Sequence, residues 1–327
     1  MKEIEKLKFE KDSLFLVVGG AGFIGTNLVE TILNLGYRVR VLDNFSTGKR
    51  ENIEQFLSNP KFELIEGDIV DFSTCEKVIK GVDYVLHQAA WGSVPRSMEM
   101  PLEYNEINVK GHLNMLEVAR REKVKKFVYA SSSSVYGDYL GLPKKEGIEG
   151  KAISPYALTK KINEEYADLY FRIYGLETIG MRYFNVFGKY QDPNGMYAAV
   201  IPKFTKLLLE DTAPTINGDG ENTRDFTYVD NVVQANLKAC LAPREVSGQA
   251  YNIGCGGRIS INQLYRVLSK LLDKSIPVKY GPERKGDIKH GNADITRASE
   301  KLGYIPEYDF EKGIELTIEW YKENLNE

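Results

Sequence analysis

The sequence has little cysteine and little histidine for its length of 327 residues. Cys75, Cys240 and Cys255 are odd in number and lie far apart, so the sequence excludes a disulfide framework and favours a reducing compartment. The three histidines are scattered as well, and no CxxC or HxxxH spacing indicates a metal site. We therefore expect a protein that folds around its own hydrophobic core, without a structural metal ion.

An excess of positive charge and a long apolar run are also missing. Lysine and arginine number 43 against 46 aspartates and glutamates, so the net charge of −3 excludes the basic surface of a general nucleic-acid binder. No apolar stretch approaches the roughly 20 residues that cross a bilayer. The N-terminal segment 1–12 alternates lysine and glutamate instead of forming a signal peptide. We expect a cytoplasmic protein with no membrane or nucleic-acid partner.

What the sequence does contain is a regular alternation of short apolar runs and helical patterns. Residues 14–18 are continuously apolar, which is typical of a strand buried on both faces, and residues 23–35 carry apolar side chains at helical spacing. The same rhythm predicts further strands at residues 39–42, 62–65, 84–86, 127–130 and 178–181. Strands that alternate with helices in this way predict an α/β protein with a doubly wound parallel sheet of the Rossmann type.

Beyond about Arg182 the composition changes. Shorter helices are separated by loops rich in glycine, asparagine, aspartate and proline, at residues 188–195, 217–222, 254–257 and 281–286. This change predicts a first domain over residues 1–185 and a smaller α/β C-terminal domain over residues 186–327. A strand and a helix near residues 223–250 are expected to return to the first domain, so that the two domains are interleaved.

A glycine turn joins the first predicted strand to the first predicted helix. Gly19, Gly22 and Gly25 have the spacing of a dinucleotide-binding turn, which needs a tight bend, close approach of the backbone to a pyrophosphate and close packing of helix on strand. Backbone N–H groups at the start of the helix then hold the phosphates. Asp43 ends the second strand, where its carboxylate accepts hydrogen bonds from ribose hydroxyls and repels the 2′-phosphate of NADP. These features predict NAD as the cofactor.

A serine-rich strand end and a helix start carry the second group of polar residues. Ser131 to Ser134 follow a predicted strand at the edge where open α/β sheets bind ligands. Tyr156 and Lys160 are four apart at the start of a predicted helix and share one face of it. A free tyrosine has a pKa near 10, and a neighbouring ammonium together with an oxidised nicotinamide ring would lower this pKa. The pattern predicts a phenolate base assisted by a serine hydroxyl.

Further motifs accompany the glycine turn and the Tyr-Lys pair. They are GGAGFIG (19–25), DNFSTG (43–48), GDI (67–69), LHQAA (86–90), SSSVYGD (132–138), SPYALTK (154–160), RYFNVFG (182–188), TRDFTYVD (223–230) and YNIG (251–254). Together they resemble the extended short-chain dehydrogenase/reductase family, and within it the nucleotide-sugar C4-epimerases, from about Leu14 to Trp320. QAAWGSVPRS (88–97) and QDPNGMYAAVIPKF (191–204) are most similar to UDP-N-acetylglucosamine 4-epimerases of the bacterial polysaccharide type.

The resemblance implies an isomerase, a NAD-dependent C4-epimerase of UDP-hexoses that works through a transient 4-keto sugar. The implied substrates are UDP-N-acetylglucosamine and UDP-N-acetylgalactosamine first, and UDP-glucose and UDP-galactose second. The implied catalytic residues are Ser132, Tyr156 and Lys160. The residues implied in NAD binding are Gly19, Gly22, Phe23, Ile24, Gly25, Asp43, Asn44, Ser46, Thr47, Gly48, Asp68, Ile69, Gln88, Ala89, Ala90, Asn108, Tyr156, Lys160 and Tyr183. Those implied in binding the nucleotide sugar are Ser93, Arg96, Ser132, Ser133, Ser134, Tyr156, Asn185, Val200, Arg224, Arg284, Asp287 and Gly291.

The resemblance also separates this chain from sibling enzymes. The related 4,6-dehydratases carry an Asp-Glu pair after the catalytic threonine, and the UDP-glucuronate decarboxylases carry a glutamate just before Val-Tyr-Gly. Ser133 and Ser134 stand here instead, so the carboxylate that elimination requires is missing. Gly291 lies where a bulky tyrosine is associated with exclusion of N-acetyl sugars, which implies room for them. A turn that needs a glycine is the alternative reason for Gly291.

Several alternatives stay open at this stage. Lys49 and Arg50 follow Asp43, and a cation there would accommodate the 2′-phosphate of NADP. A UDP-glucuronate or UDP-N-acetylglucuronate 4-epimerase, a net nucleotide-sugar reductase and a non-catalytic NAD-binding scaffold would share these motifs. Members of the family are commonly homodimers, and the helices near residues 105–122 and 154–174 are the candidates for the contact between subunits.

Overall fold

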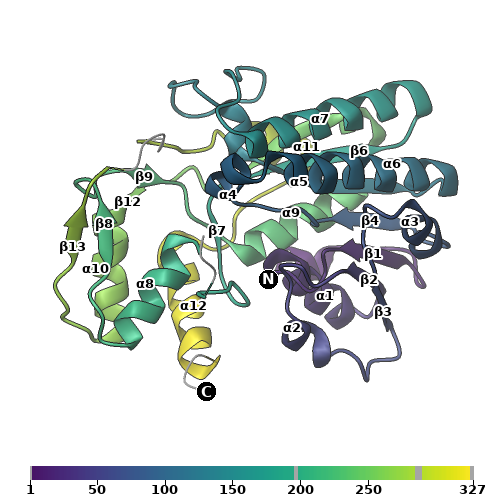
Figure 1. The fold of residues 1–327 in the computed structure, drawn as a ribbon. Coiled ribbons are helices and arrows are strands. Elements are labelled where there is room, and N and C mark those ends of the chain that lie inside the picture. Colours follow the sequence, from purple (N-terminus) through teal and green to yellow (C-terminus); the bar gives the residue numbers. More distant parts are fainter. Residues whose placement is uncertain (1, 195–197, 284–288, 325–327) are drawn as a thin grey trace.

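The structure is a computed structural model that describes residues 2–194, 198–283 and 289–324 (Figure 1). A sheet of seven parallel strands forms its centre, in the order β11-β6-β5-β4-β1-β2-β3. The order of the strands reverses at β1: β2 and β3 are added on one side of it, and β4, β5 and β6 on the other. Ligands of open α/β sheets bind at such a point. The predicted doubly wound parallel sheet is confirmed. Its strands are β1 (Leu14–Val18), β2 (Arg38–Asp43), β3 (Phe62–Glu66), β4 (Tyr84–His87), β5 (Lys126–Ser132), β6 (Thr178–Tyr183) and β11 (Gln249–Ile253).

Helices cover both faces of this sheet because its strands carry apolar side chains on both sides. Val17 of β1 is buried in one cluster, while its neighbours Leu16 and Val18 are buried in another, since successive strand side chains point to opposite faces. The first cluster is completed by α1 (Phe23–Asn34) and α9 (Val229–Leu241). The second is completed by α3 (Phe72–Val78), α6 (Gly111–Glu122) and α7 (Pro155–Tyr174), which lie together on the opposite side in Figure 1.

Short helical elements follow the carboxyl ends of the strands. A π-helical turn precedes α6, and such turns are frequent at functional sites. Because these elements start where parallel strands end, they form the rim of the crevice at the reversal point. They are α2 (Arg50–Glu54), α4 (Val94–Glu99), α5 (Pro101–Tyr104), the π-helix η2 (Asn105–Lys110) and the 3₁₀-helix η3 (Ser133–Tyr136).

A smaller unit with its own apolar cluster lies beside the sheet. Its helices α8 (Val200–Leu209), α10 (Ile261–Leu272) and α12 (Phe310–Asn324) bury their apolar faces against one another. Leu208, Leu264 and Ile314 are fully buried there. Three pairs of short strands connect these helices: β7 (Val186–Phe187) with β10 (Thr227–Tyr228), β8 (Thr215–Asn217) with β13 (Lys279–Gly281), and β9 (Thr223–Arg224) with β12 (Ile259–Ser260).

The chain passes several times between the sheet and the smaller unit. After β10 it enters α9, which packs on the sheet, and β11 then joins the sheet as its edge strand beside β6. After the smaller unit resumes, α11 (Thr296–Leu302) packs against β11. The connections between the two parts all lie at the carboxyl edge, where the cavities described below are found. Within the described ranges, no helix has the length and apolar character needed to cross a membrane.

Candidate active site

The glycine turn between β1 and α1 is held by close backbone contacts. Gly19 has a φ of +80°, and a Cβ atom added there would lie 2.7 Å from the backbone nitrogen of Ala89. A Cβ added at Gly25 would lie 2.0 Å from the carbonyl oxygen of Gly19. Packing of the chain on itself therefore requires glycine at both positions, as the predicted tight bend and helix–strand contact demand.

Gly22 is less tightly constrained by the rest of the protein than Gly19 and Gly25. It has an ordinary φ of −78°. An added Cβ would come no closer than 3.3 Å to another atom, the Gly19 carbonyl oxygen. Gly22 lies at the N-terminal end of α1 and lines a cavity of about 360 Å³. The absence of a side chain at Gly22 leaves room for a ligand in this cavity. The backbone N–H groups at the start of a helix are suited to bind a pyrophosphate.

Asp43 joins the glycine turn to the end of β2. The side chain is buried, and its carboxylate accepts hydrogen bonds from the N–H groups of Ala21 (2.9 Å) and Phe45 (2.8 Å). Burial raises the pKa of Asp43, and the two backbone donors oppose this rise. The backbone of Asn44 also contributes a hydrogen bond that lowers the pKa of Asp43. A carboxylate has about four acceptor positions, so capacity is left for a hydroxyl of a ribose.

Lys49 and Arg50 are the cations that could accommodate the 2′-phosphate of NADP. Both are paired with carboxylates. Lys49 Nζ lies 3.0 Å from Asp192, and the Arg50 guanidinium pairs with Glu66 and lies over the ring of Phe45. Their charge is therefore partly compensated within the protein. This arrangement favours NAD over NADP in the cavity beside Asp43.

Most residues predicted to bind the dinucleotide line this first cavity. They are Gly19, Gly22, Phe23, Ile24, Gly25, Asp43, Asn44, Ser46, Thr47, Gly48, Asp68, Ile69, Gln88, Ala89 and Ala90. The sequence did not point to five further lining residues, which are Leu42, Gly67, Trp91, Gly92 and Ile107. Gly67, Trp91 and Gly92 belong to the recognised motifs GDI (67–69) and QAAWGSVPRS (88–97), whereas Leu42 and Ile107 carry no chemical signal of their own.

Four predicted cofactor residues lie outside the first cavity. Asn108 is buried, and its amide bonds both backbone groups of Trp91 and the hydroxyl of Thr159, so it fixes the loop after β4. Tyr183 lines the second cavity, and its hydroxyl lies 3.0 Å from Gln88 Oε1. Tyr156 lines that cavity as well, whereas Lys160 lies behind it.

A second cavity of about 470 Å³ adjoins the first, and Ile24 and Gly92 line both. Its polar surface comes from the end of β5 and the start of α7, where Pro155 and the Ser154 cap begin the helix. The predicted substrate residues that line it are Ser132, Ser133, Ser134, Tyr156, Asn185, Arg224 and Gly291. The structure thus brings the serines of one strand and the tyrosine of the next helix to one wall.

The electrostatics of Tyr156 differ from the sequence expectation. Burial raises the pKa of its phenol, and a hydrogen bond from Ser132 opposes the rise. Lys160 does not face the phenol directly, because its Nζ donates to the carbonyl oxygen of Ala130 at 2.7 Å and lies 6.0 Å from the Tyr156 ring centre. Burial also lowers the pKa of Lys160, to about 8, against the opposing effect of Glu164. The helical spacing of Tyr156 and Lys160 predicted that they lie close together, whereas burial has the largest effect on the pKa of each side chain.

Ser93 and Arg96, which were predicted to bind the substrate, do not line the second cavity and instead contact residues of the loop after β4. The Ser93 side chain accepts from the Arg96 N–H at the start of α4. The Arg96 guanidinium lies 3.6 Å from the ring centre of Trp91. Their observed contacts therefore stabilise the loop between β4 and α5.

The remaining substrate residues belong to the smaller unit. Val200 lines a third cavity of about 210 Å³, to which Asn185 and Arg224 also contribute. Asn185 and Arg224 thus lie between the second and third cavities, as expected of residues that would hold the nucleotide part of a substrate. Arg284 and Asp287 lie outside the described residues.

The second cavity also contains a residue that the sequence analysis missed. Lys144 lines it from the long loop between η3 and α7. Its only sequence signal is a lysine after a proline in a glycine-rich loop, which most often marks a solvated turn.

A Rossmann sheet whose glycine-lined cavity adjoins a Ser-Tyr-Lys cluster defines the short-chain dehydrogenase/reductase class. Comparison with known proteins agrees, since residues 15–254 match the model of the NAD dependent epimerase/dehydratase family. The chain belongs to this family, and NAD is its cofactor.

Solved structures of similar chains contain different bound UDP-sugars. A UDP-N-acetylglucosamine 4-epimerase from Methanobrevibacter ruminantium, in complex with UDP-N-acetylmuramic acid, is 38% identical, with a TM-score of 0.91 over 96% of this chain and 99% of that one. A UDP-glucose 4-epimerase from Thermotoga maritima with UDP-glucose is 37% identical, with a TM-score of 0.90 over 95% and 99%. A UDP-glucuronic acid 4-epimerase from Bacillus cereus with UDP-glucuronic acid and NAD is 32% identical, with a TM-score of 0.87 over 95% and 99%.

Proposed function

We propose that this protein is a NAD-dependent UDP-sugar 4-epimerase that interconverts UDP-N-acetylglucosamine and UDP-N-acetylgalactosamine. The observation that carries the proposal is the composition of the second cavity. It contains the phenol of Tyr156 and the hydroxyls of Ser132 to Ser134, and none of its described lining residues is an aspartate or a glutamate. Hydroxyl groups support proton exchange at a sugar hydroxyl, whereas elimination or decarboxylation needs an additional acid or base.

In the proposed reaction Tyr156 takes the proton from the sugar O4, and Ser132 holds that oxygen beside the phenol. NAD, when bound in the first cavity, supplies a reversible hydride acceptor for C4. Gly22, Asp43 and the other lining residues would hold it by its pyrophosphate and ribose. After the 4-keto ring has turned, Tyr156 returns the proton to O4, and the product has the opposite configuration at C4. Oxidation and reduction cancel, so no external reductant is consumed.

The epimerisation also requires the 4-keto ring to turn while its nucleotide stays bound. Asn185 and Arg224 lie at the boundary between the second and third cavities and would anchor the UDP part. Arginine suits this role because its planar guanidinium offers several donors to phosphate oxygens. The sugar part would lie against serines and glycines, whose small side chains leave space for rotation.

The choice of an N-acetylated sugar rests on Gly291. This residue lines the second cavity, and an added Cβ would have no other atom within 4 Å. The alternative reason for a glycine was a turn, but the backbone of Gly291 does not adopt a positive φ. Open space at this wall supports an enlarged sugar pocket that accepts an acetamido group.

We further propose that the protein is a cytoplasmic homodimer. Support comes from α7, where Leu158 and Ile173 are large apolar side chains with 50% and 61% of their surface exposed. A second copy would remove these side chains from water. Light scattering coupled to gel filtration would report about twice the 37.0 kDa chain mass, and a single chain mass would contradict the dimer.

Proton NMR of the sugar products tests the activity. The purified protein is incubated without added cofactor, separately with UDP-N-acetylglucosamine, UDP-glucose and UDP-glucuronic acid. We expect the C4 epimer of the N-acetylated sugar to form fastest, without a steady absorbance change at 340 nm. Faster conversion of UDP-glucuronic acid would replace the proposed substrate. A stoichiometric change at 340 nm would instead indicate a net reductase.

A further inference from the structure

The loop between η3 and α7 places Lys144 at the wall of the second cavity. The backbone of Lys144 is fixed on both sides: its N–H donates to the carbonyl oxygen of Asn292 at 2.8 Å, and its carbonyl oxygen accepts from the Asp294 N–H at 2.9 Å. The side-chain amide of Asn252 donates to the same carbonyl oxygen at 2.9 Å. The loop is therefore tied to the chain directly after Gly291, and Lys144 starts from a rigid position.

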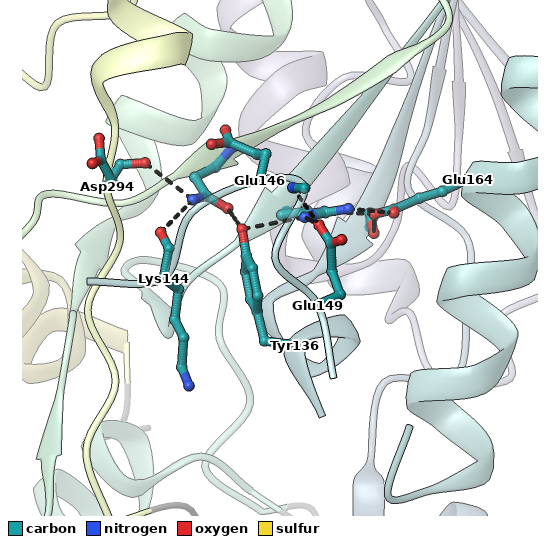
Figure 2. Close-up of polar contacts among 10 residues, drawn as sticks. Tyr136, Lys144, Glu146, Glu149, Glu164 and Asp294 are labelled. Atoms are coloured by element: carbon teal, nitrogen blue, oxygen red, sulfur yellow. Dashed lines mark hydrogen bonds and ion pairs between the residues drawn. The ribbon is translucent and has the colours of Figure 1, made fainter. Parts of the chain in front are cut away.

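The side chain of Lys144 is separated from the carboxylates in its neighbourhood. Figure 2 shows Glu149 and Glu164 on one side of the loop and the Lys144 ammonium group pointing away from them. Both glutamates already pair with the buried guanidinium of Arg182. In residues 2–194, 198–283 and 289–324, no carboxylate forms an ion pair with Lys144, and its Nζ donates to the carbonyl oxygen of Tyr139.

The Lys144 ammonium is nevertheless almost completely buried, with 3% of the residue exposed. Burial alone lowers its pKa, since no neighbouring charge among the described groups acts on it. An ammonium group has three donors, and one of them is used by Tyr139. The face of the Tyr139 ring, 5.0 Å away, also contacts this cation, and no counter-ion pairs with it among the described residues. A buried cation with unused donors is unfavourable unless another group compensates it.

The position of Lys144 indicates where that compensation comes from. It lines the cavity that also contains Ser132, Tyr156 and Gly291. The other described cation of this cavity, Arg224, lies at the boundary with the third cavity, so the two positive groups contact different parts of the space. Lys144 therefore faces the compartment in which the proposed function puts the hexose.

We propose that the Lys144 ammonium donates a hydrogen bond to an oxygen acceptor of the substrate hexose, and that Lys144 is thereby a specificity-determining residue. The proposal rests on the UDP-sugar epimerase function given above. The acceptor is a carbonyl or carboxylate oxygen, because such an oxygen carries more negative charge than a hydroxyl and compensates a buried cation better. An acetamido group at C2 and a carboxylate at C6 both offer this chemistry.

Replacement of Lys144 by methionine tests the hexose contact. We expect Lys144→Met to raise KM for the N-acetylated or acidic UDP-sugar by about tenfold to a hundredfold, the range for a hydrogen bond to a charged group. The affinity for UDP, which lacks the hexose, should stay unchanged in calorimetric titration. Lys151→Met, on an exposed lysine of the same loop, is the matched control and should behave as the wild type.

The melting temperature distinguishes this role from a structural one. A lysine that only supports the loop would lower the melting temperature and weaken UDP and every UDP-sugar alike when it is removed. A buried cation kept for the ligand should leave the melting temperature equal or higher after Lys144→Met. Lys144→Gln keeps a donor for the Tyr139 carbonyl oxygen but removes the positive charge. Full recovery of sugar affinity in this variant would show that the ammonium is not needed and would contradict the proposal, whereas persistent loss would support it.

Two comparisons complete the experiment. A larger loss with UDP-glucuronic acid than with UDP-N-acetylglucosamine would identify a carboxylate as the acceptor, and the reverse order would identify the acetamido carbonyl. An equal loss for UDP and for the three UDP-sugars would overturn the proposal. If the wild type converts no sugar, the epimerase function fails, but titration of UDP against UDP-sugars in both variants still decides the role of Lys144.

Discussion

The two cavities of the candidate active site differ in how their walls are fixed. In the dinucleotide cavity, Gly19 and Gly25 are held by backbone contacts that exclude any side chain, and Asp43 is held by two backbone donors. In the sugar cavity, an atom added at Gly291 would meet nothing within 4 Å. Gly19 and Gly25 in the first cavity are fixed because the chain packs on itself there, whereas the wall of the second cavity at Gly291 has unfilled space.

This difference fits the two demands of the proposed reaction. A cofactor that stays bound through many cycles benefits from a preorganised site, since little conformational entropy is lost on binding. A hexose that turns over between oxidation and reduction needs space and few rigid contacts. Lys144 and Arg224 then supply attachment at particular points of the second cavity, in place of a close fit.

The largest expected effect comes from removing the proposed proton acceptor in the second cavity. Tyr156→Phe should lower kcat by about 10²- to 10⁴-fold, the contribution typical of general acid–base catalysis. NAD should stay bound, because Tyr156 lines the second cavity and not the first. NMR turnover and the NAD released on acid denaturation measure the two effects. A rate close to that of the wild type would contradict the assignment of the base.

Substitutions of Gly25 and Gly22 test whether these two glycines of the first cavity serve different purposes, close packing of the chain and room for NAD. Gly25→Ala should destabilise the fold by about 1–3 kcal/mol or more, because its Cβ would lie 2.0 Å from a backbone oxygen. Gly22→Ala should leave the melting temperature nearly unchanged and lower the affinity for NAD, because the added methyl group enters the cavity. Thermal melts and NAD titration of both variants check this. Equal destabilisation by both would show that Gly22 serves packing as well.

A large side chain in place of Gly291 tests whether the unfilled space in the second cavity determines which sugar is accepted. Gly291→Tyr should suppress turnover of UDP-N-acetylglucosamine by about tenfold more than turnover of UDP-glucose, since a clash with the acetamido group costs more than 1 kcal/mol. Gly257→Tyr is the control, because Gly257 also has open space but lies outside the cavity. Equal losses on both sugars would mean that Gly291 does not select the substrate.

A smaller effect is expected from the lysine behind the tyrosine. Burial lowers the pKa of Lys160 to about 8 in the folded state, against an ordinary value of 10.5. Below pH 8 both states bind the proton and the full penalty of burying the charge is present; as pH rises from 8 toward 10.5 the penalty is relieved. Lys160→Met should therefore be more stable than the wild type at pH 7, by on the order of 3 kcal/mol at most.

The same difference in stability should shrink by pH 10. Chemical denaturation of both proteins at the two pH values measures it. A wild type that is the more stable protein at pH 7 would mean that the hydrogen bond from Lys160 to the Ala130 carbonyl oxygen outweighs the cost of burying the charge.

Sequence patterns predicted the parts of this protein that depend on neighbouring residues. The apolar run at residues 14–18, the glycine turn and the spacing of Tyr156 and Lys160 are local, and the structure contains each as a strand, a turn and a helix face. Fifteen residues predicted for the cofactor line one cavity because motifs at the ends of parallel strands meet at one edge.

Other properties depend on segments that are far apart in the chain. The chain around residues 292–294 holds the backbone of Lys144, and burial among several elements sets the charge of Lys160 and Tyr156. The contact of the Arg96 guanidinium with the ring of Trp91 also depends on how the loop after β4 folds, and the predicted role of Arg96 in sugar binding stays a prediction.

The sequence by itself thus determined the sheet, the glycine turn and the shared helix face of Tyr156 and Lys160, because each depends on residues close together in the chain with a fixed geometric period. Only the tertiary structure decided which cations are compensated, which glycines face empty space and how far each pKa moves. Those properties arise from burial and from partners tens to hundreds of residues away, and no local pattern records them.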